Sequence, residues 1–135
     1  MITKINHIGI AVKNLDEQIP FYRDVLGLDF KGVEEVEDQG VRIAMFAVGE
    51  VHIELLEPTS EESPVAKFIK KRGDGLHHIA YHTDDIEKEI SRLVQNNIEM
   101  IDHIPRKGAH NTKIAFLHPK ASGKILTEIC GSEEN

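Results

Sequence analysis

Alternating apolar and polar positions divide the first half of the chain into one helix and four strands. Residues 5–12 alternate and end in β-branched side chains, which predicts a strand. A helix is predicted over residues 15–26, with Asn14 or Asp16 as its N-cap and Gly27 as its C-cap. The side chains expected on the buried side of this helix are Ile19, Phe21, Tyr22, Val25 and Leu26. The other predicted strands are residues 28–36, 41–48 and 51–56.

The second half repeats this order of elements. Residues 78–82 predict a strand, Thr83 or Asp84 an N-cap, and residues 86–95 a helix. Three more strands are predicted near residues 99–104, 113–117 and 124–129, and a short helix, with Pro64 at its first position, within the linker. The pattern predicts one α+β domain over residues 1–135. Its parts are two βαβββ modules, residues 5–57 and 76–130, joined by residues 58–75 and forming a curled mixed sheet around a shared cleft.

Composition narrows the class of protein. A formal net charge of −7 without a basic stripe argues against nucleic-acid binding. Cys130 is the only cysteine, so an intrachain disulfide is excluded and a reducing compartment fits. No apolar run is long enough to span a membrane or to form the core of a signal peptide. We therefore expect a cytoplasmic protein.

The repeat singles out two histidines and two glutamates, which are residue types that can bind a metal ion. His7 and His78 begin strands of the two halves and lie 71 positions apart (78 − 7). Glu54 and Glu128, late in the last strand of each half, lie 74 positions apart (128 − 54). Carboxylates flanked by apolar strand residues need a partner, because an unpaired buried charge is very costly. Two histidines and two glutamates suit Co, Ni, Mn, Fe or Zn.

A purely structural interpretation remains open at this point. A single histidine at the start of a strand is more often a hydrogen-bonded structural residue than a metal ligand, and a single strand glutamate is more often solvated. The repeat alone leaves the two interpretations balanced. Histidines without a counterpart in the other half are interpreted as structural or as neighbours of the ligands; they are His52, His77, His103 and His118.

Four stretches of the chain resemble the methylmalonyl-CoA epimerase family of the vicinal oxygen chelate superfamily. They are NHIGIAV (residues 6–12), ELLEP (54–58), GLHHIAY (75–81) and FLHPK (116–120). The resemblance covers nearly the whole chain, and the double-histidine and His-Pro-Lys motifs are the more specific ones. It implies metal-paired βαβββ modules with the ligands His7, Glu54, His78 and Glu128. It also favours cobalt among the possible metals and a homodimeric assembly.

This chain departs from the family pattern at three positions. Some members carry glutamine where this chain has Glu54, and some carry a second catalytic glutamate where this chain has Ile43. Asn111 stands where a glycine is expected, a mild change because asparagine tolerates positive φ. The resemblance implies epimerisation of (R)- and (S)-methylmalonyl-CoA through proton abstraction and an enolate. Ile43 cannot serve as that second acid–base group, and the candidates for the pair are Glu128 and Glu54, which the repeat of the two modules relates to each other.

An acyl-CoA substrate also carries phosphates. Arg106 and Lys120 lie beside glycine-containing turns and are the candidate CoA-binding cations, although basic loop residues are more often simply solvated.

Three other functions share parts of this pattern. A glyoxalase-type isomerase would use the same ligands on a glutathione hemithioacetal, but the double-histidine and His-Pro-Lys motifs favour the CoA substrate. A non-haem iron dioxygenase would use His7, His78 and Glu128, and the additional carboxylate of Glu54 argues against the open positions that it needs. A metal-free binding module of the same fold has no need of all four ligand residues.

Overall fold

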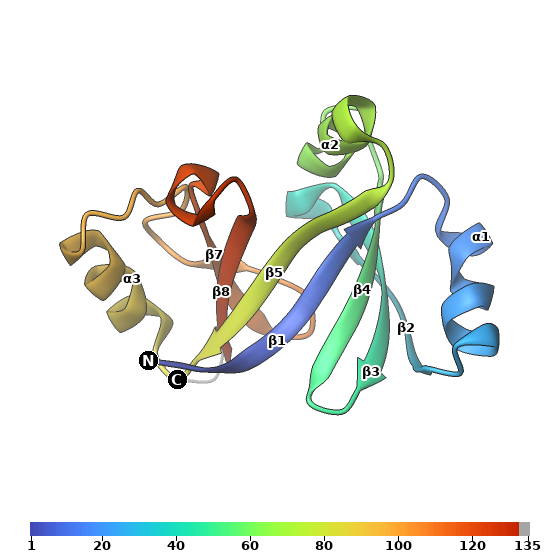
Figure 1. Cartoon of the computed structure of the whole chain (residues 1–135), viewed down its shortest axis with the longest axis horizontal. Coiled ribbons are helices and arrows are strands. Elements are labelled where there is room, and N and C mark those ends of the chain that lie inside the picture. The colour runs from blue at the N-terminus through green and yellow to red at the C-terminus, as the bar shows by residue number, and fades with distance from the viewer. Residues whose placement is uncertain (133–135) are drawn as a thin grey trace. The chain divides into compact units, whose positions relative to one another are not determined.

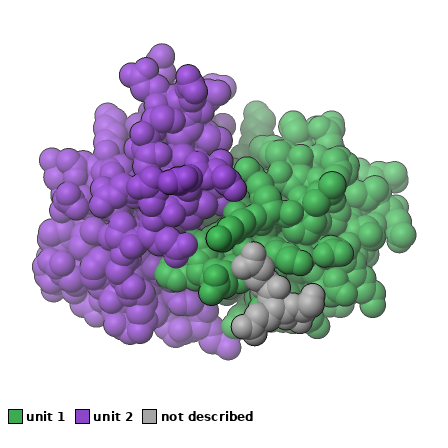
Figure 2. All heavy atoms as spheres, turned by 180° about the vertical axis from the view of Figure 1, so that it is seen from behind, with its two compact units in different colours: residues 1–6, 78–135 green, residues 7–77 purple. Residues whose placement is uncertain are grey.

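The computed structural model describes residues 1–132, which form two compact units. One unit consists of residues 7–77, and the other of residues 1–6 together with the described part of the chain from residue 78 onward (Figure 2). The first strand, β1 (Ile2–Ala11), contributes to both units. Each unit contains the βαβββ order that the sequence predicts, so the α+β class and the paired modules are confirmed.

In the unit of residues 7–77, β1 lies at one end of a mixed sheet with the order β2-β3-β4-β1 (Figure 1). Its other strands are β2 (Asp29–Val36), β3 (Val41–Val48) and β4 (Val51–Pro58). β1 and β4 are parallel, whereas β2, β3 and β4 pair in antiparallel fashion. Gly49, with φ +61°, occupies the two-residue turn of the β3–β4 hairpin. The linker helix α2 (Pro64–Arg72) begins after the N-cap Ser63.

One face of this sheet packs against helix α1 (Leu15–Pro20). The buried cluster there joins helix residues to alternate strand residues: Val12, Leu15, Ile19, Ala44, Phe46 and Leu55. Because successive strand residues point to opposite faces, Glu54 and Leu56 lie on the face away from α1. The alternation of β4 thus places Glu54 on the sheet face that α1 does not cover.

The helix predicted over residues 15–26 is only partly α-helical. Asn14 caps it as predicted, its side chain accepting a hydrogen bond from the backbone N–H of Glu17. After Pro20 the chain winds into a π-helical turn (Phe21–Val25), in which Leu26 N–H donates to the Phe21 carbonyl. The wider turn rotates the following side chains away from the core. The prediction of a buried side was therefore wrong for Phe21, Val25 and Leu26, which are exposed.

The second unit repeats the arrangement with the strand order β5-β8-β7-β6. Its strands are β5 (Gly75–Thr83), whose first residues, 75–77, belong to the other unit, and β6 (Arg106–Lys107), β7 (Thr112–Leu117) and β8 (Leu126–Ser132). β5 and β8 are parallel, and helix α3 (Ile86–Gln95) covers one face through Ile86 and Ile90. No helix among residues 1–132 is long and apolar enough to cross a membrane.

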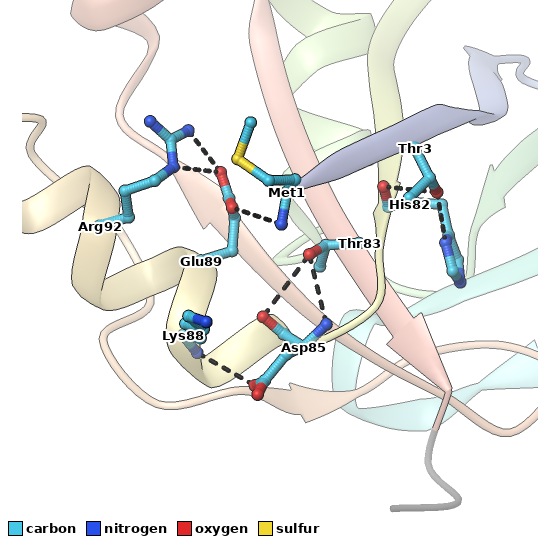
Figure 3. A network of polar contacts seen from close by, with 8 residues as sticks. All are labelled: Met1, Thr3, His82, Thr83, Asp85, Lys88, Glu89 and Arg92. Atoms are coloured by element: carbon cyan, nitrogen blue, oxygen red, sulfur yellow. Dashed lines mark hydrogen bonds and ion pairs between the residues drawn. The ribbon is translucent and has the colours of Figure 1, made fainter.

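Two details of the second half differ from the prediction. Asp85, not Thr83 or Asp84, is the N-cap of α3, and its carboxylate accepts from the N–H of Lys88 (Figure 3). The strand predicted over residues 99–104 is absent. Met100 makes only an isolated bridge with Leu117, and the Asp102 carboxylate accepts the Phe116 N–H at 2.9 Å. A side chain thus takes the place of a backbone ladder partner, and the edge strand forms later, at Arg106–Lys107.

Helix α3 is tied to the rest of its unit by a buried carboxylate that the sequence did not single out. Glu89 is 1% exposed, and its Oε2 accepts two hydrogen bonds from Arg92, at 3.1 and 2.5 Å (Figure 3). The amine of Met1 lies 3.3 Å from Oε1 in an ion pair. The Arg92 hydrogen bond holds the pKa of Glu89 below its ordinary value, against the opposing effect of burial.

Candidate metal centre

The unit of residues 7–77 contains a buried histidine–glutamate pair on the sheet face away from α1. His7 Nδ1 lies 3.4 Å from Glu54 Oε2, and the two residues are 7% and 4% exposed. In the parallel pairing of β1 with β4, Gly9 lies opposite Glu54. Glu54 is thus two residues along the ladder from His7, and the residue of β1 directly opposite Glu54 is a glycine without a side chain.

The second unit contains an equivalent pair. His78 Nε2 lies 3.2 Å from Glu128 Oε1, and these residues are 4% and 3% exposed. In the parallel pairing of β5 with β8, Ala80 lies opposite Glu128, again two residues beyond the histidine. The internal repeat seen in the sequence is therefore also a repeat of strand register. Each unit forms the same pair with the same offset, and a small residue, Gly9 or Ala80, lies opposite the glutamate.

The chemistry of these pairs fits a divalent cation. Each pair combines an imidazole nitrogen with a carboxylate oxygen, and both groups are withdrawn from water. A buried carboxylate needs a charged or hydrogen-bonding partner, and neutral imidazole with carboxylate is a common ligand combination for first-row transition metals. The donor set alone does not select among these metals.

Comparison with known proteins identifies the family. Residues 6–116 match the model of the Glyoxalase/Bleomycin resistance protein/Dioxygenase superfamily. The mitochondrial methylmalonyl-CoA epimerase of Dictyostelium discoideum is 36% identical over 129 residues, which cover 95% of this chain and 78% of that protein. The chain belongs to the methylmalonyl-CoA epimerase family. The family resemblance that the sequence motifs indicated is thereby confirmed.

Two further relatives extend this comparison. A solved structure of methylmalonyl-CoA epimerase in complex with methylmalonyl-CoA and NH4+ has a TM-score of 0.95 and 38% identity, over 99% of this chain and 97% of that one. The uncharacterised protein YqjC of Bacillus subtilis (strain 168) is 41% identical over 129 residues, covering 96% of this chain and 92% of the relative. The structural likeness confirms the vicinal oxygen chelate, or glyoxalase-like, fold.

The position at which some members of the epimerase family carry a glutamate lies close to Glu54. In the β3–β4 ladder, Met45 lies opposite Glu54 and Ile43 lies two residues further, opposite Leu56. Residues that face each other across a ladder share a side of the sheet, so Ile43 lies on the face of Glu54. Ile43 is 3% exposed and purely apolar. Ile43 therefore offers no group that can exchange a proton.

The neighbouring histidine, His77, has a different environment from His78. Its ring makes an edge contact with Phe68 of α2, the ring centroids being 5.0 Å apart. Adjacent residues in a strand point to opposite faces, so His77 and His78 cannot share one site. This geometry supports His78 as the partner of Glu128.

The two cations expected to bind CoA differ in their surroundings. Lys120 lies in a 3₁₀ turn (Pro119–Ser122), and its Nζ is 2.5 Å from the Glu99 carboxylate. Arg106 lies on β6 and pairs instead with Asp102. Between β6 and β7, Asn111 has φ +57°, the left-handed conformation expected of a residue that replaces glycine. The two cations therefore belong to separate local clusters, each with its own carboxylate.

Proposed function

We propose that this chain is a metal-dependent epimerase that interconverts (R)- and (S)-methylmalonyl-CoA. The observation that carries this proposal is the repeated strand register, which gives each unit one buried histidine–glutamate pair. Membership of the epimerase family supports the choice of substrate. Inversion at one carbon needs two proton-transfer groups, and the repeat supplies two carboxylates.

His7, Glu54, His78 and Glu128 would together hold one divalent metal ion. Family resemblance favours cobalt, and the same ligands suit Ni, Mn, Zn or Fe. The ion would supply Lewis-acid stabilisation of the negative charge that develops on the thioester and carboxylate oxygens.

Glu54 and Glu128 would carry the acid–base chemistry. The hydrogen to be exchanged is bound to the carbon between the thioester carbonyl and the carboxylate. One glutamate takes this proton, and the electron pair of the C–H bond passes into an enolate. The other glutamate donates a proton to the opposite face and so inverts the carbon. General acid–base catalysis of this kind contributes about 10²- to 10⁴-fold to the rate.

The CoA part of the substrate needs a separate contact. We assign Lys120 to the phosphates, because its turn lies in the His-Pro-Lys motif and Gly123 closes the turn with φ +67°. The ion pair with Glu99 would orient the ammonium group for this contact. Family resemblance also leads us to propose a homodimer, which sedimentation analysis would test.

The proposed activity is tested by incubating one epimer of methylmalonyl-CoA with the protein and following formation of the other by chiral separation. Protein stripped by a chelator should be inactive, and addition of Co²⁺ should restore activity. The hemithioacetal of methylglyoxal and glutathione serves as the comparison substrate. Turnover of the hemithioacetal without epimerisation would contradict the proposal in favour of a glyoxalase.

A further inference from the structure

Arg106 lies on the same sheet face as His78 and Glu128. In the second unit, Phe116 lies opposite Glu128 across the β7–β8 ladder, and its ring meets the His78 ring edge-on with centroids 5.8 Å apart. The guanidinium carbon of Arg106 lies 5.5 Å from the centroid of Phe116. Phe116 thus contacts both the guanidinium and the histidine of the histidine–glutamate pair. A cation in this position lies beside the proposed reaction centre.

Asp102 fixes this guanidinium from one side. Its Oδ1 lies 3.4 Å from Arg106 Nε, while its Oδ2 accepts the Phe116 N–H at 2.9 Å. Nε is buried without a hydrogen bond among residues 1–132, although the side chain as a whole is 40% exposed. Asp102 therefore holds the side chain of Arg106 at Nε, while the exposed part of the guanidinium is accessible to a ligand.

The free carboxylate of the substrate needs a partner of opposite charge at the proposed centre. Before proton transfer, the glutamate that acts as the base is a carboxylate and the glutamate that acts as the acid is protonated. The substrate brings a further carboxylate, and proton abstraction places additional negative charge on it as the enolate forms. A guanidinium presents parallel N–H donors that match a carboxylate, and this geometry is more selective than a point charge.

We propose that Arg106 binds the free carboxylate of the acyl group and selects thioesters of dicarboxylic acids over simple acyl-CoA. This inference rests on the proposed function. It replaces the expectation that Arg106 binds a CoA phosphate. One aromatic ring separates Arg106 from His78, whereas the phosphates lie at the far end of the pantetheine arm from the thioester.

The test compares the binding of two achiral ligands to the metal-loaded protein by isothermal titration calorimetry. Malonyl-CoA and propionyl-CoA share the whole CoA moiety, and only malonyl-CoA carries the free carboxylate. Arg106→Gln should weaken malonyl-CoA binding about 10- to 100-fold, the value of a charged hydrogen bond, and leave propionyl-CoA binding unchanged. Arg106→Lys should recover part of the loss. The neighbouring Lys107→Gln, on the opposite face of β6, is the matched control and should change neither affinity.

Each other outcome overturns the assignment. Equal weakening of both ligands by Arg106→Gln would show a phosphate or pantetheine contact. A lower melting temperature with both affinities intact would show that Arg106 only supports β6. Because binding of malonyl-CoA needs no turnover, these results stand apart from the epimerase assay. Failure of the unmodified protein to bind either thioester would overturn the proposed function together with this inference.

Discussion

At the scale of single residues, the two histidine–glutamate pairs combine burial with close contact. Each imidazole lies within 3.4 Å of its glutamate. The carboxylates are nearly as buried as core leucines and cannot rely on water to stabilise their charge. A metal ion bound by these residues would stabilise that charge.

The adjacent histidines of β5 give a direct residue-level test. His78→Ala should lower the affinity for Co²⁺ by more than about 100-fold, because residues outside the ligand shell alone change metal affinity by 10- to 100-fold. His77→Ala is the matched control. It removes the ring contact with Phe68 and should leave the metal affinity unchanged. Equal metal affinities of the two variants, measured by competition with a chromogenic chelator, would rule out the assigned ligand.

The sequence could predict these four residues because a local signal marks each of them. A histidine at the start of an alternating strand and a glutamate between apolar neighbours recur at nearly the same offset. The contact between Arg106 and Phe116 leaves no such mark. This contact depends on the position of β6 and on the hydrogen bond between the Asp102 carboxylate and the Phe116 N–H. Both are set by tertiary packing.

At the scale of elements, most strands follow their hydrophobic period, and the differences have local causes. The π-helical turn after Pro20 widens the helix, so the 3.6-residue period no longer describes which side chains are buried. Residues 99–104 have strand-forming side chains, but the backbone N–H groups of Ile101 and Asp102 both donate to the Phe116 carbonyl, and the Asp102 carboxylate accepts the Phe116 N–H. The hydrophobic period of a sequence does not reveal that a side chain replaces a backbone partner in a ladder.

The hairpin that carries Arg106 depends on close packing at Gly108. A Cβ atom there would lie 2.6 Å from Ile114 Cγ2 and 2.7 Å from Thr112 Oγ1. Gly108→Ala should therefore lower the free energy of unfolding by about 1–3 kcal/mol, the usual cost of overpacking. Gly75→Ala in β5 meets nothing within 4 Å and is the matched control. If urea denaturation gave both variants the stability of the unmodified protein, the packing at this hairpin would be looser than described.

Helix α3 should make stability depend on pH through Glu89. Its pKa is lowered in the folded protein, so its contribution is present above the unfolded-state value and is lost as the pH falls through the folded value. Glu89→Gln should cost about 1–3 kcal/mol at pH 7, and the difference from the unmodified protein should shrink in acid. Urea denaturation at several pH values measures this.

Asp24→Asn supplies the comparison for Glu89, because Asp24 also pairs with an arginine but is 58% exposed. Exposed pairs contribute little, so its variant should differ only slightly from the unmodified protein at every pH. A constant difference for Glu89→Gln from pH 7 down to pH 3 would contradict the role of the Glu89 charge.

At the scale of the whole molecule, the internal duplication divides the proposed chemistry between two equivalent modules. Each module contributes one histidine and one glutamate from the same places in its parallel strand pair. The roles of the two glutamates should therefore be separable by mutation. Each should serve one face of the substrate carbon, and neither alone should suffice for inversion.

Solvent exchange in D₂O tests this division most directly. Single epimers of methylmalonyl-CoA are incubated with metal-loaded Glu54→Gln and Glu128→Gln, and deuterium uptake and inversion are both measured. Glutamine keeps an oxygen ligand, so the metal content should be retained and is checked first. Both variants should lose inversion, while each should still exchange the proton of one epimer, and that epimer should differ between the two variants. Full epimerisation and exchange by Glu54→Gln would contradict the division of proton transfer between Glu54 and Glu128.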